Sequence, residues 1–482
     1  MNIFKSLSWL IMLLSSISFS QIENSTQKPN VVFILVDDLG WSDLGIQGSK
    51  YYLTPRIDEL AKEGIRFSNA YAANPVCSPT RASIMSGKDP ADVRVNISNW
   101  IGAQEYENRQ NQKMIQPGVG AYLPLEEFTM AEAFQNSGYK TQFIGKWHLG
   151  ETEEYWPENQ GFDNNIAGWS KGNPGSFFSP YHNPRLKDGP DGEYLPYRLG
   201  REAVAFIEEQ KNSKDPFFLF FSMYNVHTPI EAPKELVERF EKRREKLGLP
   251  EQAEYSLNKG IKERSIQNDA TYAAMIWAMD SVVGDVKDKL KELGMLDNTA
   301  IVFFSDNGGL SNPGYGVTSN KPLRGGKGWI YEGGIREPLI IKYDPLTKSK
   351  AGSIIQEPVI SYDFYPTLLE LSEIDNTYSN ELEGKSLVPV LNGQPLEREC
   401  IYWHYPHYSP QGGGPASAIR MGALKLIYFY ETDSYELYNL HDDISEQHNL
   451  ADNNPKMVKD LSVKLFKHLE KINASYPIKR PH

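Results

Sequence analysis

Continuous apolar runs lie at residues 30–36, 216–221 and 300–304, and polar residues follow each run at once. A shorter strand-like segment lies at 140–144. Uninterrupted apolar runs of this length are typical of strands buried on both faces, as in parallel sheets. The pattern therefore predicts a sheet whose central strands have no solvent-exposed face.

Segments with helical signals lie between these runs. They cover residues 54–64, 129–138, 233–246 and 266–293, and the second opens with a capping-box pattern. Strands that alternate with helices predict a doubly wound, mostly parallel α/β sheet with helices on both faces. By contrast, residues 155–198 are rich in Gly, Pro and Asn and are expected to form loops.

The pattern changes after residue 396. Short strands are predicted at 402–408, 418–421, 424–430 and 436–439, followed by an amphipathic helix at 457–472. We therefore expect a large α/β domain over residues 21–396. A smaller α+β subdomain is expected over 397–482, with one helix covering an antiparallel sheet.

Residues 1–20 have the pattern of a secretory signal peptide. Lys5 precedes an apolar stretch, and Ser18 and Ser20 resemble a small-x-small cleavage site. An uncleaved anchor is the alternative, but the apolar stretch is short. No later stretch approaches the roughly 20 apolar residues that a membrane span needs. We expect an exported protein, periplasmic or secreted, with no stable membrane insertion.

Charge and cysteine content narrow the function classes. The formal net charge is −12, and removing Lys5 with the leader makes it more negative. This acidity argues against nucleic-acid binding but not against a small anionic substrate held by local positive charge. The chain has two cysteines, Cys77 and Cys400, which could pair in an exported protein.

Polar residues with chemical potential follow four of the predicted strands. These residues are Asp37 and Asp38, Lys146 and His148, His227, and Asp306 and Asn307. Ligands of open α/β sheets bind beyond the carboxyl ends of the strands. Four such strand ends therefore predict one shared site.

Cys77 opens a further candidate segment. Pro79 suits the first turn of a helix that Gly87 would end. Cys77 is then expected at the helix N-terminus, where free N–H groups favour an anion and activate a thiol. A buried structural cysteine is the alternative interpretation.

The candidate residues suit the transfer of a tetrahedral oxyanion. The aspartates at 37, 38 and 306 and the amide of Asn307 offer oxygen ligands, which favour Ca²⁺ or Mg²⁺ over zinc. Arg81, Lys146 and Lys327 add fixed positive charge. A cation, these charges and a nucleophile could transfer either a sulfuryl or a phosphoryl group.

The motifs resemble those of the type I, formylglycine-dependent sulfatases of the alkaline phosphatase superfamily. Cys77-Ser-Pro-Thr-Arg81 matches the C-x-P-x-R signature, and Gly145-Lys-Trp-His-Leu-Gly150 is similar to the second signature. The two aspartate motifs and Leu323-Arg-Gly-Gly-Lys327 match in order and type. The resemblance runs from about residue 29 to the end and implies an alkaline-phosphatase-like fold.

The resemblance also implies the cofactor and the nucleophile. Cys77 would be oxidised to formylglycine (3-oxoalanine) by a formylglycine-generating maturation enzyme, and the aldehyde hydrate would supply the attacking oxygen. One Ca²⁺ would bind to Asp37, Asp38, Asp306, Asn307 and the modified residue 77.

Roles for the remaining residues follow from the same resemblance. Arg81 would stabilise the hydrate, while Lys146 and Lys327 would bind sulfate oxygens. His227 would protonate the departing sugar oxygen. His148 would remove the second hydroxyl proton of the hydrate, which expels sulfate and regenerates the aldehyde.

Two other functions stay open at this point. A phosphonate monoester or phosphodiester hydrolase of the same superfamily can share the C-x-P-x-R signature. A catalytically dead, secreted glycan-binding protein belongs to a different class, but the full set of metal and charge residues argues against it. Zinc phosphatases fit poorly, because only His148 and His227 follow the predicted strands.

The substrate expected for an exported calcium sulfatase is a sulfated oligo- or polysaccharide, of the ulvan or carrageenan type for example. Aromatic and basic residues could contact its sugars, although each could equally be packing. The candidates are Trp100, Trp169, His404, Tyr405, His407 and Arg420.

Overall fold

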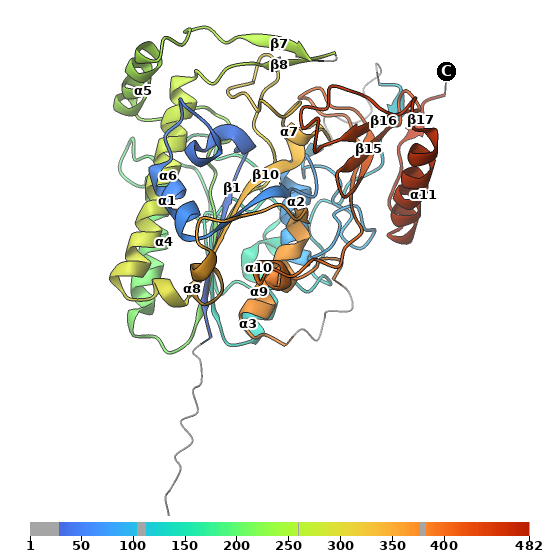
Figure 1. Ribbon diagram of the computed structural model, residues 1–482. Helices are drawn as coiled ribbons and strands as arrows, with labels where there is room; N and C mark the ends of the chain where they lie inside the picture. The colour runs from blue at the N-terminus through green and yellow to red at the C-terminus, as the bar shows by residue number, and fades with distance from the viewer. Residues whose placement is uncertain (1–27, 104–111, 259, 376–381, 482) are drawn as a thin grey trace, which may run out of the picture.

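A computed structural model describes residues 28–103, 112–258, 260–375 and 382–481 (Figure 1). Its centre is a nine-stranded sheet. The strand order is β11 (Ile354–Ile355), β2 (Ile65–Tyr71), β10 (Arg336–Lys342), β9 (Thr299–Ser305), β1 (Asn30–Val36), β6 (Phe217–Ser222), β4 (Lys140–Gly145) and β5 (Asn164–Ile166), with β12 (Val359–Ile360) also pairing with β2. The four strands expected from the sequence thus lie side by side, in the order β9, β1, β6, β4.

The middle of this sheet is parallel. β1 pairs in parallel with both β6 and β9, and β4 pairs in parallel with β6. β10 is the exception, because it runs antiparallel to its neighbours β2 and β9. The expected mostly parallel α/β sheet is confirmed, and the antiparallel β10 makes it a mixed sheet.

Helices cover both faces of the sheet, as Figure 1 shows. Alternate residues of β1 enter the two cores: Val32, Ile34 and Val36 face one, and Val31, Phe33 and Leu35 face the other. The first core includes α1 (Pro55–Glu63), α4 (Leu195–Glu209), α5 (Lys234–Lys246) and α6 (Ala270–Glu292). The second includes α2 (Cys77–Ser86), α3 (Met130–Asn136), α9 (Phe364–Leu371) and α10 (Val388–Leu391).

Most of the expected helices form at the expected places. α1 has Pro55 in its first turn, and Thr129 and Glu132 make the predicted capping box of α3. The prediction of a loop over residues 155–198 is wrong at its end, because α4 begins at Leu195. A hairpin of β7 (Tyr255–Asn258) and β8 (Ile261–Arg264) was also not expected, and it lies at the top of Figure 1.

The C-terminal part folds as a four-stranded antiparallel sheet. Its strands are β13 (Cys400–Tyr405), β14 (Ala416–Met421), β15 (Leu424–Phe429) and β16 (Ser434–Asn439), in that order. α11 (Pro455–Lys471) packs on it through Leu461, Leu465 and Leu469. On its other face, Trp403 joins a core that contains Tyr71 of β2, so this sheet packs against the larger one.

Short elements complete the described chain. A two-stranded sheet joins β3 (Met114–Ile115) to β17 (Ile478–Lys479), and α7 (Glu332–Ile335) and α8 (Asp344–Thr347) flank β10. The expected leader at residues 1–20 lies outside the described residues. Among the helices that the structure describes, none is long and apolar enough to cross a membrane. Cys77 and Cys400 are both free, so they form no disulfide.

Candidate active site

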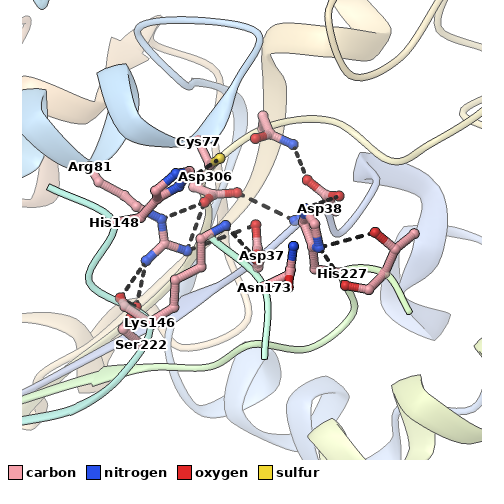
Figure 2. Close-up of polar contacts among 12 residues, drawn as sticks. Asp37, Asp38, Cys77, Arg81, Lys146, His148, Asn173, Ser222, His227 and Asp306 are labelled. Carbon is pink, nitrogen blue, oxygen red and sulfur yellow. Dashed lines mark hydrogen bonds and ion pairs between the residues drawn. The ribbon is translucent and has the colours of Figure 1, made fainter. Parts of the chain in front are cut away.

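The predicted site residues meet at one edge of the central sheet (Figure 2). Asp37 and Asp38 directly follow β1, and Asp306 and Asn307 follow β9. Lys146 follows β4, and His227 lies shortly after β6. Parallel strands end at the same edge, which is why these distant segments come together.

Each carboxylate of the cluster is held by a positive side chain. Lys146 Nζ lies 2.7 Å from Asp37 Oδ2, and Lys327 Nζ lies 2.6 Å from Asp38 Oδ1. Arg81 Nη2 lies 2.7 Å from Asp306 Oδ2. All of these side chains are buried. These ion pairs limit the repulsion that neighbouring buried carboxylates would otherwise feel.

Arg81 is fixed by further contacts beneath the cluster. Its Nη1 donates to the Ser222 hydroxyl at 2.6 Å and to the carbonyl of Lys146 at 2.8 Å. The Ser222 hydroxyl itself donates to that carbonyl at 2.6 Å. Arg81 therefore joins α2 to the ends of β4 and β6 and keeps these segments in register.

The donor set fits a hard divalent cation. Asp37 Oδ1, Asp38 Oδ2 and Asn307 Oδ1 are buried and have no hydrogen-bond partner within the described part of the chain. Ligand atoms of Asp37, Cys77 and Asp306 lie within 4.8 Å of one another. Buried oxygens without donors are costly unless something positive binds them. Oxygen donors of this kind suit Ca²⁺ or Mg²⁺.

The ionisation of the two adjacent aspartates differs. Burial raises the pKa of Asp37 to about 8, and the nearby Asp306 and Asp38 add to this against the attraction of Lys146. Burial also disfavours the charged form of Asp38, but Lys327, His227 and Lys146 outweigh it and lower the pKa of that carboxyl. Negative charge is therefore available at Asp38, while Asp37 needs a further positive charge to ionise fully.

Cys77 is the first residue of α2, as expected, and Gly87 ends the helix with a φ of 67°. Its side chain is only 3% exposed. The expectation that this position activates the thiol is wrong for an unmodified cysteine: burial raises the pKa of the Cys77 thiol, although Lys146 and Lys327 act in the opposite direction. Desolvation outweighs the nearby positive charges.

His148 faces Cys77 through a defined tautomer. Its Nε2 lies 3.0 Å from the carbonyl oxygen of Ile101, which can only accept, so Nε2 carries the proton. Its Nδ1 then directs a lone pair at Cys77 Sγ, 3.4 Å away. Burial and Lys146 lower the pKa of His148 far below its usual value. A neutral imidazole in this orientation can accept a proton from a group at position 77.

His227 lies on the other side of the cluster and is 15% exposed. Its Nδ1 lies 2.7 Å from the carbonyl oxygen of Thr228, so Nδ1–H donates there, and its Nε2 lies 3.7 Å from Asp38 Oδ2. Burial, together with Lys327, lowers the pKa of His227 to about 3. Nε2 is therefore the nitrogen that could exchange a proton with a bound group.

A cavity of about 470 Å³ opens above these residues. Cys77, His148, His227 and Lys327 lie in its wall, and so does Trp100. The structure thus brings the predicted nucleophile position, both histidines and one lysine to a single space that a ligand can enter.

Part of the cavity wall was missed by the sequence analysis. The missed residues that carry a side chain able to contact a ligand are Glu151, Ser170, Lys171, Asn173 and Gln411. Asn173, labelled in Figure 2, lines the cavity together with His227. The signal that could have found this segment is its position in the long Gly- and Asn-rich stretch after β5, near the predicted mouth.

For three of the suggested sugar-contacting residues, His404, His407 and Arg420, the structure corrects the prediction. His404 is buried between the Ser417 hydroxyl and the Ser475 carbonyl, and His407 is buried against the Ser98 hydroxyl. Arg420 is buried and donates to Tyr71 and to the carbonyl of Gly422. None of the three lines the cavity. The hydrogen bonds of His404 and Arg420 instead satisfy their buried polar atoms within and beside the C-terminal sheet.

The other three candidates, all aromatic, differ in whether they line the cavity. Trp100 lines the cavity as proposed. Tyr405 is buried, with its hydroxyl 3.3 Å from Asn99 Oδ1. Trp169 packs against the second core, and the cavity wall begins at the next residue, Ser170. Trp169 therefore supports the wall instead of forming it.

Comparison with known proteins agrees with this arrangement. Residues 29–374 match the family model described as Sulfatase. The chain belongs to the sulfatase family. A second model, the C-terminal part of N-sulphoglucosamine sulphohydrolase, matches residues 326–475 of this sulfatase. The protein is therefore a sulfuric ester hydrolase by family.

Relatives of this sulfatase align over most of their length. A sulfatase of Formosa agariphila is 31% identical, over 92% of this chain and 88% of its own. N-acetylgalactosamine-6-sulfatase of Canis lupus familiaris is 29% identical, over 89% and 77%. The solved structure of Ps i-CgsB in complex with k-i-k-neocarrahexaose has a TM-score of 0.74 at 30% identity and covers 92% of each chain. The expected alkaline-phosphatase-like fold is thereby confirmed.

Proposed function

We propose that this sulfatase is a calcium-dependent enzyme that removes sulfate from a sulfated carbohydrate through a formylglycine at position 77. The observation that carries the proposal is the position of Cys77. It begins α2 on the wall of the cavity, beside the buried acidic cluster and within 3.4 Å of His148 Nδ1.

Calcium is proposed because the donors are hard oxygens. Asp37, Asp38, Asp306 and Asn307 would hold it, together with the modified residue 77. When bound, the ion and the formylglycine hydrate supply charge compensation and the nucleophilic oxygen. The three orphaned oxygens of the cluster support this assignment, because a cation would satisfy all of them.

The protein side chains have separate tasks in this proposal. Lys146 and Lys327 bind the sulfate oxygens, and Arg81 holds Asp306 and the group at position 77 in place. His148 accepts a proton at Nδ1, the nitrogen left free by its bond to Ile101. His227 would take up a proton from solvent at Nε2 once bound sulfate offsets the charge of Lys327, and would then donate that proton to the departing oxygen.

The carbohydrate substrate is proposed from similarity and from the cavity. Ps i-CgsB, whose structure contains k-i-k-neocarrahexaose, resembles this chain over 92% of its length. Trp100 gives the cavity an aromatic wall against which a sugar ring could pack. We propose a role in polysaccharide degradation, with an algal polymer of the carrageenan or ulvan type as substrate. The leader at residues 1–20 supports a periplasmic or secreted location.

The test uses protein co-expressed with a formylglycine-generating enzyme. Mass spectrometry of the peptide containing residue 77 should show the aldehyde, and the enzyme should release sulfate from sulfated oligosaccharides. Cys77→Ala should abolish this release while leaving the free energy of unfolding within about 3 kcal/mol of the wild type.

A phosphodiester substrate is assayed in parallel. Turnover of the phosphodiester above that of every sulfate ester would contradict the proposal. So would sulfate release that survives Cys77→Ala, because the mechanism would then have lost its nucleophile and kept its activity.

A further inference from the structure

One wall of the active-site cavity is made by residues 170–173, hereafter the 170–173 wall. All four of its residues line the cavity. The other charged residues among the described lining residues are Glu151 and Lys327. Lys171 is exposed, so its ammonium group is in contact with solvent at the cavity mouth. This wall has no role in the chemistry proposed above.

The 170–173 wall stands on a fixed base. The carbonyl of Ala167 accepts hydrogen bonds from the Tyr224 hydroxyl and from Asn183 Nδ2, both at 3.0 Å. Asn165 Nδ2 donates to the carbonyl of Gly168 at 2.8 Å. The carbonyl of Trp169 accepts from the His148 amide at 3.3 Å. Backbone held in this way gives Lys171 a defined origin, so only its side chain has to be ordered by a ligand.

Gly172 brings the wall directly against the catalytic face. A Cβ at this position would lie 2.4 Å from His148 Cε1, so the backbone of Gly172 packs against the imidazole ring. A substrate whose scissile group reaches position 77 and His148 therefore lies beside the 170–173 wall. The rest of that substrate occupies the cavity that Lys171 also lines.

The charge of Lys171 is not committed elsewhere. Lys146 and Lys327 are each within 2.7 Å of an aspartate oxygen of the cluster. Lys171, in contrast, has no carboxylate within ion-pair distance in the described ranges of the chain, and Glu151 has no such cation. An ammonium at a cavity mouth without a protein partner is suited to bind an anion brought by the ligand.

We propose that Lys171 is a specificity-determining residue that binds a second anionic group, a sulfate or a carboxylate, on the part of the substrate outside the scissile ester. The proposal rests on the proposed sulfatase function of the same cavity. Glu151, which lines the same cavity outside the 170–173 wall, would disfavour an anion on its own side and accept hydrogen bonds from sugar hydroxyls there. The enzyme would thus prefer sugars with two negative charges to sugars with one.

The test compares three oligosaccharides of equal length that share one scissile sulfate. The first carries no other charge, the second carries an additional sulfate, and the third carries a uronate carboxylate. Each is assayed with the formylglycine-containing wild type and with Lys171→Gln, Lys171→Arg and Lys214→Gln. Lys214 is an exposed lysine just before β6, at the opposite end of that strand from the site. Lys214→Gln therefore removes the same charge far from the cavity.

Lys171→Gln is expected to lower kcat/KM about tenfold on the substrate whose second anion Lys171 binds, because a charge-assisted contact is lost. The change should lie mainly in KM, since the contact is remote from the reacting atoms. The singly charged substrate should change less than about twofold. Lys171→Arg should retain most of the preference, and Lys214→Gln should behave as the wild type. The doubly charged substrate whose kcat/KM falls in Lys171→Gln shows whether Lys171 binds a sulfate or a carboxylate.

Equal losses on all three substrates, or no loss on either doubly charged substrate, would overturn the role of Lys171 and leave the sulfatase function intact. A wild type with oxidised Cys77 that releases no sulfate from any of the three and from 4-nitrophenyl sulfate would instead overturn the proposed function and the Lys171 proposal together. The two failures are therefore distinguishable.

Discussion

Gly172 is a position at which a single methyl group would collide with the active site. A Cβ there would lie 2.4 Å from Cε1 and 2.7 Å from Nδ1 of His148. Distances this short force the imidazole to move, and misplacement of a catalytic group by about 1 Å can cost about a hundredfold in rate. We expect Gly172→Ala to lower kcat for sulfate release by ten- to a hundredfold, roughly.

Gly118→Ala is the matched control for this substitution, because a Cβ at Gly118 meets no atom within 4 Å. Chemical denaturation should give Gly172→Ala a free energy of unfolding close to that of the control, since its segment lies at the cavity mouth. A kcat equal to that of the control would show that His148 tolerates displacement.

If the acidic cluster binds Ca²⁺ as proposed, Asp37 should make that binding dependent on pH. Its pKa is raised to about 8 by burial, so below that pH the cation-free carboxyl is largely protonated. Binding of Ca²⁺ requires the ionised form and should release a proton. Affinity should therefore rise about tenfold per pH unit up to about pH 8 and level off above it.

Isothermal titration calorimetry of Ca²⁺ binding at pH 7, in two buffers with different ionisation enthalpies, measures this proton release. Asp37→Asn should remove most of the released proton, and it should also weaken binding through loss of a charged ligand. Identical heats in both buffers for the wild type would be inconsistent with a protonated Asp37.

Among the elements, the C-terminal sheet holds a histidine that should make folding sensitive to acid. Burial lowers the pKa of His404 to about 4. The folded state therefore stays neutral where the unfolded histidine, with its pKa near 6.5, already binds a proton. Stability should be lost as the pH falls from about 6.5 to about 4, by about 1.4 kcal/mol per pH unit.

Urea denaturation at pH 7 and pH 5 tests this prediction. The fall in the free energy of unfolding between the two pH values should be about 2 kcal/mol smaller in His404→Gln than in the wild type. His441→Gln is the control, because His441 is 83% exposed and should keep the wild-type fall. An unchanged fall in His404→Gln would mean that His404 is not the group that titrates.

The same elements show what the sequence could and could not predict. The apolar runs that became β1, β6 and β9 were recognisable because a strand buried on both faces needs no polar positions. α4 was missed because its first residues continue a Gly- and Pro-rich stretch, although Pro196 suits a helix start. The direction of β10 is set by its partners β2 and β9, which lie far away in sequence.

The site was predictable to the same extent. Residues that directly follow a strand, such as Asp37 and Asp306, could be placed because strand ends converge. His404 and His407 were misassigned because sequence alone does not distinguish a histidine that lines a cavity from a buried one. In the structure each is buried with one ring nitrogen hydrogen-bonded to a serine hydroxyl. Lys171 was missed because the path of a long loop depends on tertiary contacts such as the Tyr224 hydrogen bond to Ala167.

At the scale of the whole molecule, a buried charge cluster joins the two sheets. Lys425 Nζ of β15 lies 2.9 Å from Glu332 of α7 and 2.9 Å from Glu446, and all three side chains are fully buried. The Glu332 carboxylate also accepts a hydrogen bond from the Tyr71 hydroxyl of β2 at 2.7 Å. The C-terminal sheet is thus attached to the segment that follows Lys327.

Lys425→Met should strongly destabilise the protein, because it leaves the buried Glu446 without its cation and Glu332 with Arg336 at 3.3 Å. The expected loss in the free energy of unfolding is about 3–5 kcal/mol. Lys464→Met is the control: Lys464 lies 2.8 Å from Glu399, but both side chains are exposed, so little change is expected. Equal effects in denaturation experiments would contradict the dependence on burial.

If Cys77 is oxidised as proposed, the complete burial of α2 should limit the period in which this can happen. All ten residues of Cys77–Ser86 are buried, so a maturation enzyme cannot bind this segment in the finished fold. α2 packs in the second core against α9 (Phe364–Leu371), and synthesis of the roughly 280 intervening residues takes about 14–55 s at typical translation rates. On the proposed mechanism, oxidation of Cys77 would compete with folding, and a molecule that folds first would stay inactive. The active fraction of a preparation would then record the outcome of that kinetic competition.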